Sequence, residues 1–290
     1  KLASWIKDKS CKNIVILSGA GISCSAGIPD FRTPGTGLYD NLQKYNLPFP
    51  EAVFDLDFYR DNPEPFLSLA KELWPGLRHS PTVTHSFVAL LEKKGLLLRS
   101  YTQNIDGLEV LAGLSPERLV ECHGHFRSAS CIRCKTPMDG EECKNIILSR
   151  NSKKNSAAAA AAAVPPRCVK CNSYVKPDIV FFGEGLPNRF GRLLEKDLRK
   201  IDLLIVMGTS LQVAPVSMIP EMVSCRKALV NRDAVGTFAY GDGIFVSGDC
   251  DDAVLDLCEL LGWKEEVLEM NNASRIIIGE KEEKKEEDPQ

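Results

Sequence analysis

Short apolar segments alternate with helix-like segments along most of the chain, and this alternation restricts the fold more than any other feature. The apolar runs typical of buried strands are Asn13–Ser18, Leu96–Gln103, Leu119–Cys122, Asp202–Met207, Lys227–Val230 and Ile244–Val246. Strands that alternate with helices form a parallel sheet covered on both faces. The alternation therefore predicts a doubly wound α/β fold.

Helical spacing of apolar residues marks the segments between these runs. It is found at Pro63–Trp74, Pro81–Lys94, Arg189–Lys200 and Asp251–Leu261. For the second of these, Ser80 is the predicted N-cap, Pro81 lies in the first turn and Gly95 ends the helix. Residues 266–290 carry mostly charges and few apolar anchors, so we expect a disordered tail there.

The alternation is interrupted between Ser128 and Tyr174 by two Cys-x-x-Cys pairs, and by an alanine run (157–163) from which we draw nothing. Two such pairs can supply four thiolates to one tetrahedral zinc ion. A closed shell leaves no position for water, so the zinc would be structural. Two redox sites or two disulfides are the alternatives. The paired cysteines are Cys131, Cys134, Cys168 and Cys171.

These features predict a discontinuous domain organisation. Residues 1–127 and 175–265 would form the sheet domain, and 128–174 a zinc-binding module inserted in it. A further helical part of the smaller domain is expected within 33–80. The chain begins with Lys1 rather than Met, which is expected of a fragment, so an upstream targeting peptide cannot be read.

Composition excludes several classes of function. The formal net charge is -3 over 290 residues, so we expect no direct nucleic-acid binding. No window approaches the ~20 apolar residues of a membrane helix, so no membrane association is expected. Eleven cysteines, seven of them outside the two pairs, indicate a reducing compartment, either cytosol or nucleus.

A glycine turn, Gly19-Ala20-Gly21, follows the first predicted strand and indicates a turn that approaches a phosphate. The usual dinucleotide fingerprint fails here. Its third glycine would fall on Cys24, and the acidic residue expected about 20 residues further on is missing from the loop-like stretch 34–39. This departure argues against a hydride-transferring dehydrogenase and leaves nucleotide binding open.

Polar residues stand at the ends of several predicted strands. Gln103, Asn104 and Asp106 follow the second strand, and His123 the third. Ligands bind outside the carboxyl ends of parallel strands, so the convergence predicts a ligand site. The later strands end in Gly208-Thr209-Ser210 and at Asn231.

Read together, these segments resemble the sirtuin family. The motifs that carry the resemblance are Gly-Ala-Gly-Ile-Ser at 19–23, Gly-Ile-Pro-Asp-Phe-Arg at 27–32, Thr-Gln-Asn-Ile-Asp at 102–106, His123-Gly124, the four cysteines, the stretch Lys176–Glu184 and Gly-Thr-Ser-Leu at 208–211. They cover nearly all of residues 11–262. Residues 37–42 and 70–73 further resemble the mainly cytoplasmic class called sirtuin two.

The resemblance implies a Rossmann-like sheet domain with a smaller zinc-binding domain, and NAD and acyl-lysine meeting in the cleft between them. It also implies the reaction of an NAD-dependent protein-lysine deacylase, a transferase-type enzyme that removes acetyl and long-chain acyl groups. The acyl oxygen attacks the nicotinamide ribose, nicotinamide leaves, and the acyl group ends on ADP-ribose. A cytoplasmic protein, also present in the nucleus, is expected. An ADP-ribosyltransferase acting at the same NAD site is the alternative, as is a nucleotide-binding module without turnover.

Site residues are carried over by position. His123 would be the general base that deprotonates a ribose hydroxyl, and Asn104 a second catalytic residue; only the family pattern selects His123 over His125. The residues implied to hold NAD are Ala20, Gly21, Ile22, Ser23, Cys24, Asp30, Phe31, Arg32, Gln103, Asn104, Ile105, Asp106, Gly208, Thr209, Ser210, Asn231, Arg232, Asp233 and Cys250. The residues implied to bind the substrate as an added strand are Val180, Phe182, Gly183 and Glu184.

One helix bears on the acyl group. Family members that prefer succinyl groups carry a Tyr and an Arg three residues apart near the acyl pocket. The matching positions here are Leu67 and Ala70. Lys71 is adjacent, but one residue along a helix turns the side chain by ~100°. The resemblance therefore implies a preference for uncharged acyl groups.

Overall fold

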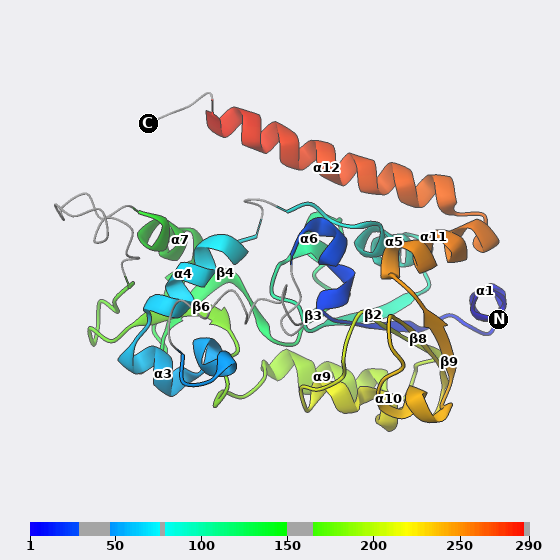
Figure 1. Ribbon diagram of the computed structural model, residues 1–290, viewed down its shortest axis with the longest axis horizontal. Helices are drawn as coiled ribbons and strands as arrows, with labels where there is room; N and C mark the ends of the chain where they lie inside the picture. The colour runs from blue at the N-terminus through cyan, green and yellow to red at the C-terminus, as the bar shows by residue number, and fades with distance from the viewer. Residues whose placement is uncertain (29–46, 76–78, 150–164, 287–290) are drawn as a thin grey trace. The chain divides into compact units, whose positions relative to one another are not determined.

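The chain folds into two compact units. The computed structural model describes residues 1–28, 47–75, 79–149 and 165–286 (Figure 1). Unit one comprises Lys1–Asp30, His79–Cys122 and Asn188–Gln290, and unit two comprises Phe31–Arg78 and His123–Pro187. Unit two thus draws on two stretches of chain, and its limits at 123 and 187 differ from the expected limits of the zinc module, 128 and 174.

Unit one is built on a parallel sheet of six strands in the order β3-β2-β1-β7-β8-β9. This confirms the predicted doubly wound fold. Chain order reverses between β1 and β7, which lie side by side at the centre. The strands are β1 (Ile14–Ser18), β2 (Leu97–Thr102), β3 (Leu119–Glu121), β7 (Leu203–Met207), β8 (Arg226–Asn231) and β9 (Ile244–Ser247).

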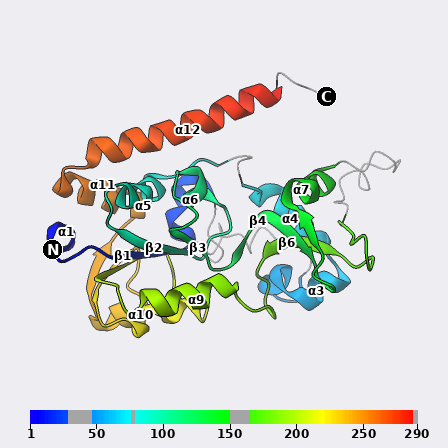
Figure 2. The same ribbon diagram turned by 180° about the vertical axis from the view of Figure 1, so that it is seen from behind.

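Helices cover both faces of this sheet. Figure 1 and Figure 2 show α9 and α10 on one face and α5, α6 and α11 on the other. Every residue of β1 and of β7 is buried, as expected for central strands of a covered parallel sheet. The helices are α1 (Leu2–Lys7), α5 (Val83–Lys93), α6 (Leu108–Leu111), α9 (Asn188–Asp197), α10 (Ile219–Met222) and α11 (Cys250–Leu261).

The start of α5 differs from the prediction. Thr82, not Ser80, is the N-cap, and its hydroxyl accepts a hydrogen bond from the His85 N–H. In return, the side chain of His85 accepts from the Thr82 N–H, which completes a capping box. Glutamate or glutamine usually closes such a box, so a sequence pattern does not single out a histidine in this place.

The C-terminal segment is also different from the expected disordered tail. It forms α12 (Lys264–Glu286), which packs against α5 and α11 (Figure 1). Val267, Asn271 and Ser274 are buried on the packed face. The Asn271 side-chain amide donates to Pro81 O and to Ser86 Oγ. Few residues anchor this helix, and two of them are polar, so composition alone does not reveal it.

Unit two holds an antiparallel sheet in the order β5-β4-β6. Its core is an aromatic cluster of Phe54, Tyr59, Phe66 and Phe181, whose rings meet edge to face. The elements are α3 (Leu56–Asp61), α4 (Glu64–Leu73), β4 (Gly124–Cys131), β5 (Pro137–Asp139), α7 (Gly140–Leu148) and β6 (Val175–Ile179).

Short 3-10 turns complete the described chain. They are η1 (Ala20–Ile22), η2 (Cys24–Ala26), η4 (Pro50–Phe54), η5 (Val216–Met218) and η6 (Gly236–Tyr240). Within the described residues, the structure contains no helix that is both long enough and apolar enough to cross a membrane.

The turn after β1 and the turn after β7 touch through their backbones. Gly21 N–H donates to Gly208 O at 2.8 Å. A Cβ on Gly21 would lie 2.7 Å from Gly208 Cα, and a Cβ on Gly208 would lie 2.5 Å from the backbone nitrogen of Ile22. Gly208 also has a φ of +57°, which disfavours other residues. Glycine at these positions is therefore a requirement of packing.

Replacing Gly208 by alanine is expected to destabilise the protein more than the same change at Gly95. Gly95 also has a positive φ, +69°, but an added Cβ there meets nothing within 4 Å. The conformational cost of ~1–2 kcal/mol is common to both changes, and Gly208→Ala adds an overpacking cost of ~1–3 kcal/mol. Urea unfolding of the two variants measures the difference. Equal losses would contradict the packing argument.

Candidate active site

A polar cluster lies at the carboxyl ends of β1, β2 and β7 in unit one. These ends meet where chain order reverses, the place at which open α/β sheets bind ligands. Ser23 follows β1, Asn104 and Asp106 follow β2, and Thr209 follows β7; all four are buried. The structure thus brings together residues that the sequence predicted separately.

Hydrogen bonds tie these side chains to one another. The Ser23 hydroxyl donates to Asp106 Oδ2 at 2.7 Å. The Asn104 side-chain amide donates to Ser23 Oγ and to Gly19 O, both at 3.2 Å. Gln103 Nε2 donates to Thr209 Oγ1 at 3.0 Å. A ligand at this edge therefore meets amide and hydroxyl groups whose orientations are already fixed.

Most backbone N–H groups of the glycine turn after β1 form hydrogen bonds within the protein. The N–H groups of Gly19, Gly21, Ile22 and Ser23 all donate to backbone carbonyls within the protein. Their amides are therefore already in use, and the glycines serve the close contact with the turn at Gly208.

Three further residues predicted to hold NAD are Ile22, Cys24 and Ile105. Ile22 is buried in the core, Ile105 is half-buried, and the Cys24 thiol donates to Ala20 O at 3.6 Å. Asp30, Phe31 and Arg32 lie outside the described residues.

A second group of predicted residues gathers at the ends of β7 and β8. Asn231 Nδ2 donates to Asp233 O, and Arg232 pairs with Asp249 at 2.6 Å on the surface. Cys250 is buried at the start of α11, where burial raises the pKa of its thiol to about 12. Cys250 is therefore a neutral thiol near pH 7. Ser210 is exposed beside the buried Thr209.

His123 belongs to unit two, directly before β4. Its carbonyl accepts from Val180 N–H at 2.8 Å. The next residue, Gly124, has a φ of +79°, and a Cβ on it would overlap Asp178 O. Glycine is thus required after His123 because β6 passes directly over this position. His125 lies on β4 itself and is half-buried.

The remaining two histidines are not exposed reactive groups. His85 is completely buried in α5, and His79 is half-buried with Nδ1 at 2.8 Å from Ala26 O. His85 is therefore a core residue of unit one.

The predicted substrate segment, residues 180–184, is anchored within unit two. The Phe182 N–H donates to Phe54 O, and Phe182 O accepts from Leu56 N–H. The Phe182 ring itself is 43% exposed. Glu184 pairs with the buried Lys176 at 2.7 Å. Burial alone would raise the pKa of Glu184, but the Lys176 ammonium holds it below its ordinary value.

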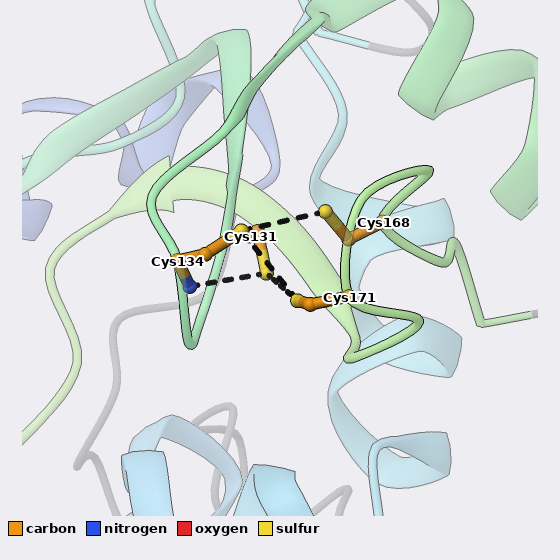
Figure 3. Close-up of side chains that lie close together, drawn as sticks. All are labelled: Cys131, Cys134, Cys168 and Cys171. Atoms are coloured by element: carbon orange, nitrogen blue, oxygen red, sulfur yellow. Dashed lines mark hydrogen bonds between the residues drawn. The ribbon is translucent and has the colours of Figure 1, made fainter.

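The four paired cysteines converge in unit two, as Figure 3 shows. Their sulfur atoms all lie within 4.8 Å of one another, and three of the Sγ–Sγ distances are 3.5 Å. A disulfide requires ~2.05 Å, and all eleven cysteines of the chain are free. Four sulfurs at ~2.3 Å from a tetrahedral zinc ion lie ~3.8 Å apart. The cluster therefore fits a structural zinc site.

Two equivalent hairpins carry these cysteines. Cys131 N–H donates to Thr136 O, and Cys168 N–H donates to Ser173 O in the same relation. The residue after each pair, Lys135 and Asn172, has a φ of +56°. The repetition indicates that both hairpins are shaped to point two sulfurs at one centre, and it argues against two independent redox sites.

Comparisons with known proteins agree with this geometry. The chain matches the Sir2 family over residues 19–215. It is 45% identical to the NAD-dependent protein deacetylase sirtuin-2 of Danio rerio, covering 98% of this chain and 77% of that protein. It is 45% identical to the NAD-dependent protein deacetylase hst2 of Schizosaccharomyces pombe, covering 94% and 79%. It is also 45% identical to the NAD-dependent protein deacetylase sirtuin-3 of Mus musculus, again covering 94% and 79%. The chain has a doubly wound sheet, a four-cysteine centre, and a polar cluster at the switch point, the place where chain order reverses between β1 and β7. By its sequence match it belongs to the Sir2 family.

Proposed function

We propose that this chain is an NAD-dependent protein deacetylase that removes acetyl and long-chain acyl groups from lysine side chains, releasing nicotinamide and O-acyl-ADP-ribose. Membership of the Sir2 family and the printed activity of its relatives support this function. The observation in the chain itself that carries it is the hydrogen-bonded cluster at the switch point. The relatives' names give no support to the ADP-ribosyltransferase alternative.

The polar cluster supports a position for NAD in unit one. Asn104 and Gln103 offer oriented amides, and Ser23 and Thr209 offer hydroxyls, which suit the ribose and nicotinamide groups of NAD. The residues at the ends of β7 and β8 would hold the adenosine half. NAD is consumed in the reaction, so it is a substrate rather than a resident cofactor.

His123 would accept the proton of a ribose hydroxyl. An imidazole accepts protons near pH 7 and suits this task. Two observations support this role. His123 matches the family motif, and its backbone is held by the hydrogen bond from Val180 N–H and by the close packing of Gly124. Asn104 would act with NAD from unit one.

Acyl-lysine proteins would bind along residues 180–184 as an added strand. The exposed ring of Phe182 and the fixed backbone around it support a role as a docking edge. We expect no direct nucleic-acid binding, because the formal net charge is -3. None of the eleven cysteines forms a disulfide, which supports residence in the cytoplasm, and also in the nucleus.

Zinc, bound by the four cysteines, would stabilise unit two without taking part in the reaction. A closed shell of four thiolates leaves no position for a reacting group. Its contribution is to hold the two hairpins together beside β4 and β6.

Changing His123 to alanine is expected to lower kcat/KM for deacetylation by ~10²–10⁴-fold, the usual contribution of a general base. NAD binding and zinc content should remain, because His123 would act only in the chemical step. His125→Ala, two residues further on in β4, is the matched control. Nicotinamide release with an acetyl-lysine peptide measures both. If His125→Ala abolishes turnover and His123→Ala does not, the assignment is wrong.

Replacing Cys131 or Cys168 by serine is expected to remove the zinc and to lower the thermal unfolding midpoint sharply. Structural zinc contributes on the order of 10 kcal/mol in small zinc-finger peptides. Cys225→Ser, outside the cluster, is the control. Elemental analysis should find one zinc per chain in the parent protein. Active protein without zinc would refute the proposal.

Desuccinylation is expected to be at least about tenfold weaker than deacetylation in kcat/KM, or ~1.4 kcal/mol in transition-state binding. Leu67 and Ala70 both lie on the buried face of α4 and offer no cation to an acyl carboxylate. An unpaired buried carboxylate is costly, whereas longer apolar chains gain ~0.8 kcal/mol per buried methylene. Matched acetyl, myristoyl and succinyl peptides test this. Similar rates on acetyl and succinyl peptides would show that these positions do not select the acyl group.

A further inference from the structure

A second cluster of titratable groups lies behind the polar cluster in unit one. One ring nitrogen of His85, one carboxylate oxygen of Asp106 and one of Glu109 lie within 4.8 Å of one another. All three residues are buried. Only Asp106 was predicted from the sequence as a site residue, so the cluster adds two groups to the candidate site.

The three groups are unequally supplied with hydrogen bonds. Asp106 accepts from the Ser23 hydroxyl at 2.7 Å and from Leu108 N–H at 3.0 Å. Glu109 is supplied more weakly, because burial raises its pKa more than hydrogen bonding to the Thr102 hydroxyl and to its own backbone N–H lowers it. Hydrogen bonds to a carboxylate stabilise its charged form. The negative charge therefore belongs on Asp106.

His85 supplies no positive charge to the cluster, because its imidazole ring is neutral. The Nδ1 atom of His85 is engaged by Thr82. It lies 2.7 Å from the Thr82 hydroxyl oxygen and accepts a hydrogen bond from the Thr82 backbone N–H at 3.2 Å. Complete burial lowers the pKa of the imidazole, although the charges of Asp106 and Asp251 act in the opposite direction. A neutral ring cannot compensate a second negative charge beside Asp106.

Two buried carboxylates at this separation are not both ionised at low cost. We propose that Glu109 is a positioning residue that keeps its proton at neutral pH, so that Asp106 alone is ionised and holds the Ser23 hydroxyl. Ser23 in turn accepts from the Asn104 amide, so the proton on Glu109 controls the orientation of the groups that would meet NAD. This rests on the proposed function of the cluster at the switch point.

The electrostatics of Glu109 agree with this assignment. Burial, and then the charge of Asp106, raise its pKa to about 8, while the nearby Thr102 hydroxyl acts in the opposite direction. The other titratable groups around the cluster are His85 on α5, Asp251 on α11, and Glu121 and Cys122 at and after the end of β3. Burial raises the pKa of Cys122 far above its ordinary value, so its thiol stays neutral. Glu109 is thus the group of this set expected to titrate between pH 7 and 9.

The pH dependence of NAD turnover tests the proposal in the full, zinc-bound chain with an acetyl-lysine peptide. With a pKa of about 8, the protonated fraction of Glu109 falls about tenfold between pH 7 and pH 9, and kcat/KM for NAD should fall with it. Glu109→Gln keeps the shape without the charge, so it should retain the parent kcat/KM at pH 7 and lose this fall. Glu117→Gln, at an exposed glutamate, should follow the parent profile.

Two kinetic results would overturn the proposal. One is a Glu109→Gln profile that superimposes on that of the parent protein. The other is a loss of tenfold or more at pH 7 in a folded Glu109→Gln variant, because the charged form would then be the one required.

A titration of the parent protein keeps the test independent of the variant and of the proposed function. In glutamate-labelled protein, carbon-13 NMR should find one side-chain carboxyl that titrates above pH 7, whereas exposed glutamates titrate near 4.3. Absence of such a carboxyl would refute the proposal even if Glu109→Gln did not fold. Failure of the parent protein to release nicotinamide would instead refute the proposed function.

Discussion

The candidate site depends on the contact between the turn after β1 and the turn after β7. Gly21 and Gly208 meet backbone to backbone, at a separation that leaves no room for a Cβ on either. Because β1 and β7 are completely buried, their ends cannot shift to relieve a bulkier contact. This contact sets where Ser23 and Thr209 stand, and Asn104 and Gln103 bond to these two residues from β2.

Unit two is organised by two different means. An aromatic cluster fills the space between α3, α4 and the segment after β6. The cysteine hairpins lie at the end of β4 and before β6, where the antiparallel sheet has only three strands. So small a sheet offers little apolar surface, and small domains commonly use a metal for this reason. The predicted substrate segment and His123 are both joined to this framework by backbone hydrogen bonds.

Charge is handled differently in the two units. In unit two, the buried Lys176 and Glu184 neutralise each other as an ion pair. In unit one, His85, Asp106 and Glu109 contain no cation near pH 7, so the charge is limited by proton binding instead. The charge of an ion pair is insensitive to pH near neutrality, whereas the proton on Glu109 is sensitive to it. The first arrangement fixes the predicted substrate segment, and the second lies within the candidate site.

The sequence by itself determined the six strands of the parallel sheet, the helices α4, α5, α9 and α11, the four-cysteine centre and the family, because these depend on local periodicity and on motifs a few residues long. It also placed Gln103, Asn104 and Thr209 at strand ends, and the parallel sheet brought them together as expected. It did not identify Thr82 as the cap of α5, nor α12, whose buried face uses Asn271 and Ser274. Only the tertiary structure joined His85 and Glu109 to Asp106. These two residues come from different helices, and the partners that set the charge of a buried group are neighbours in space, which no local pattern records.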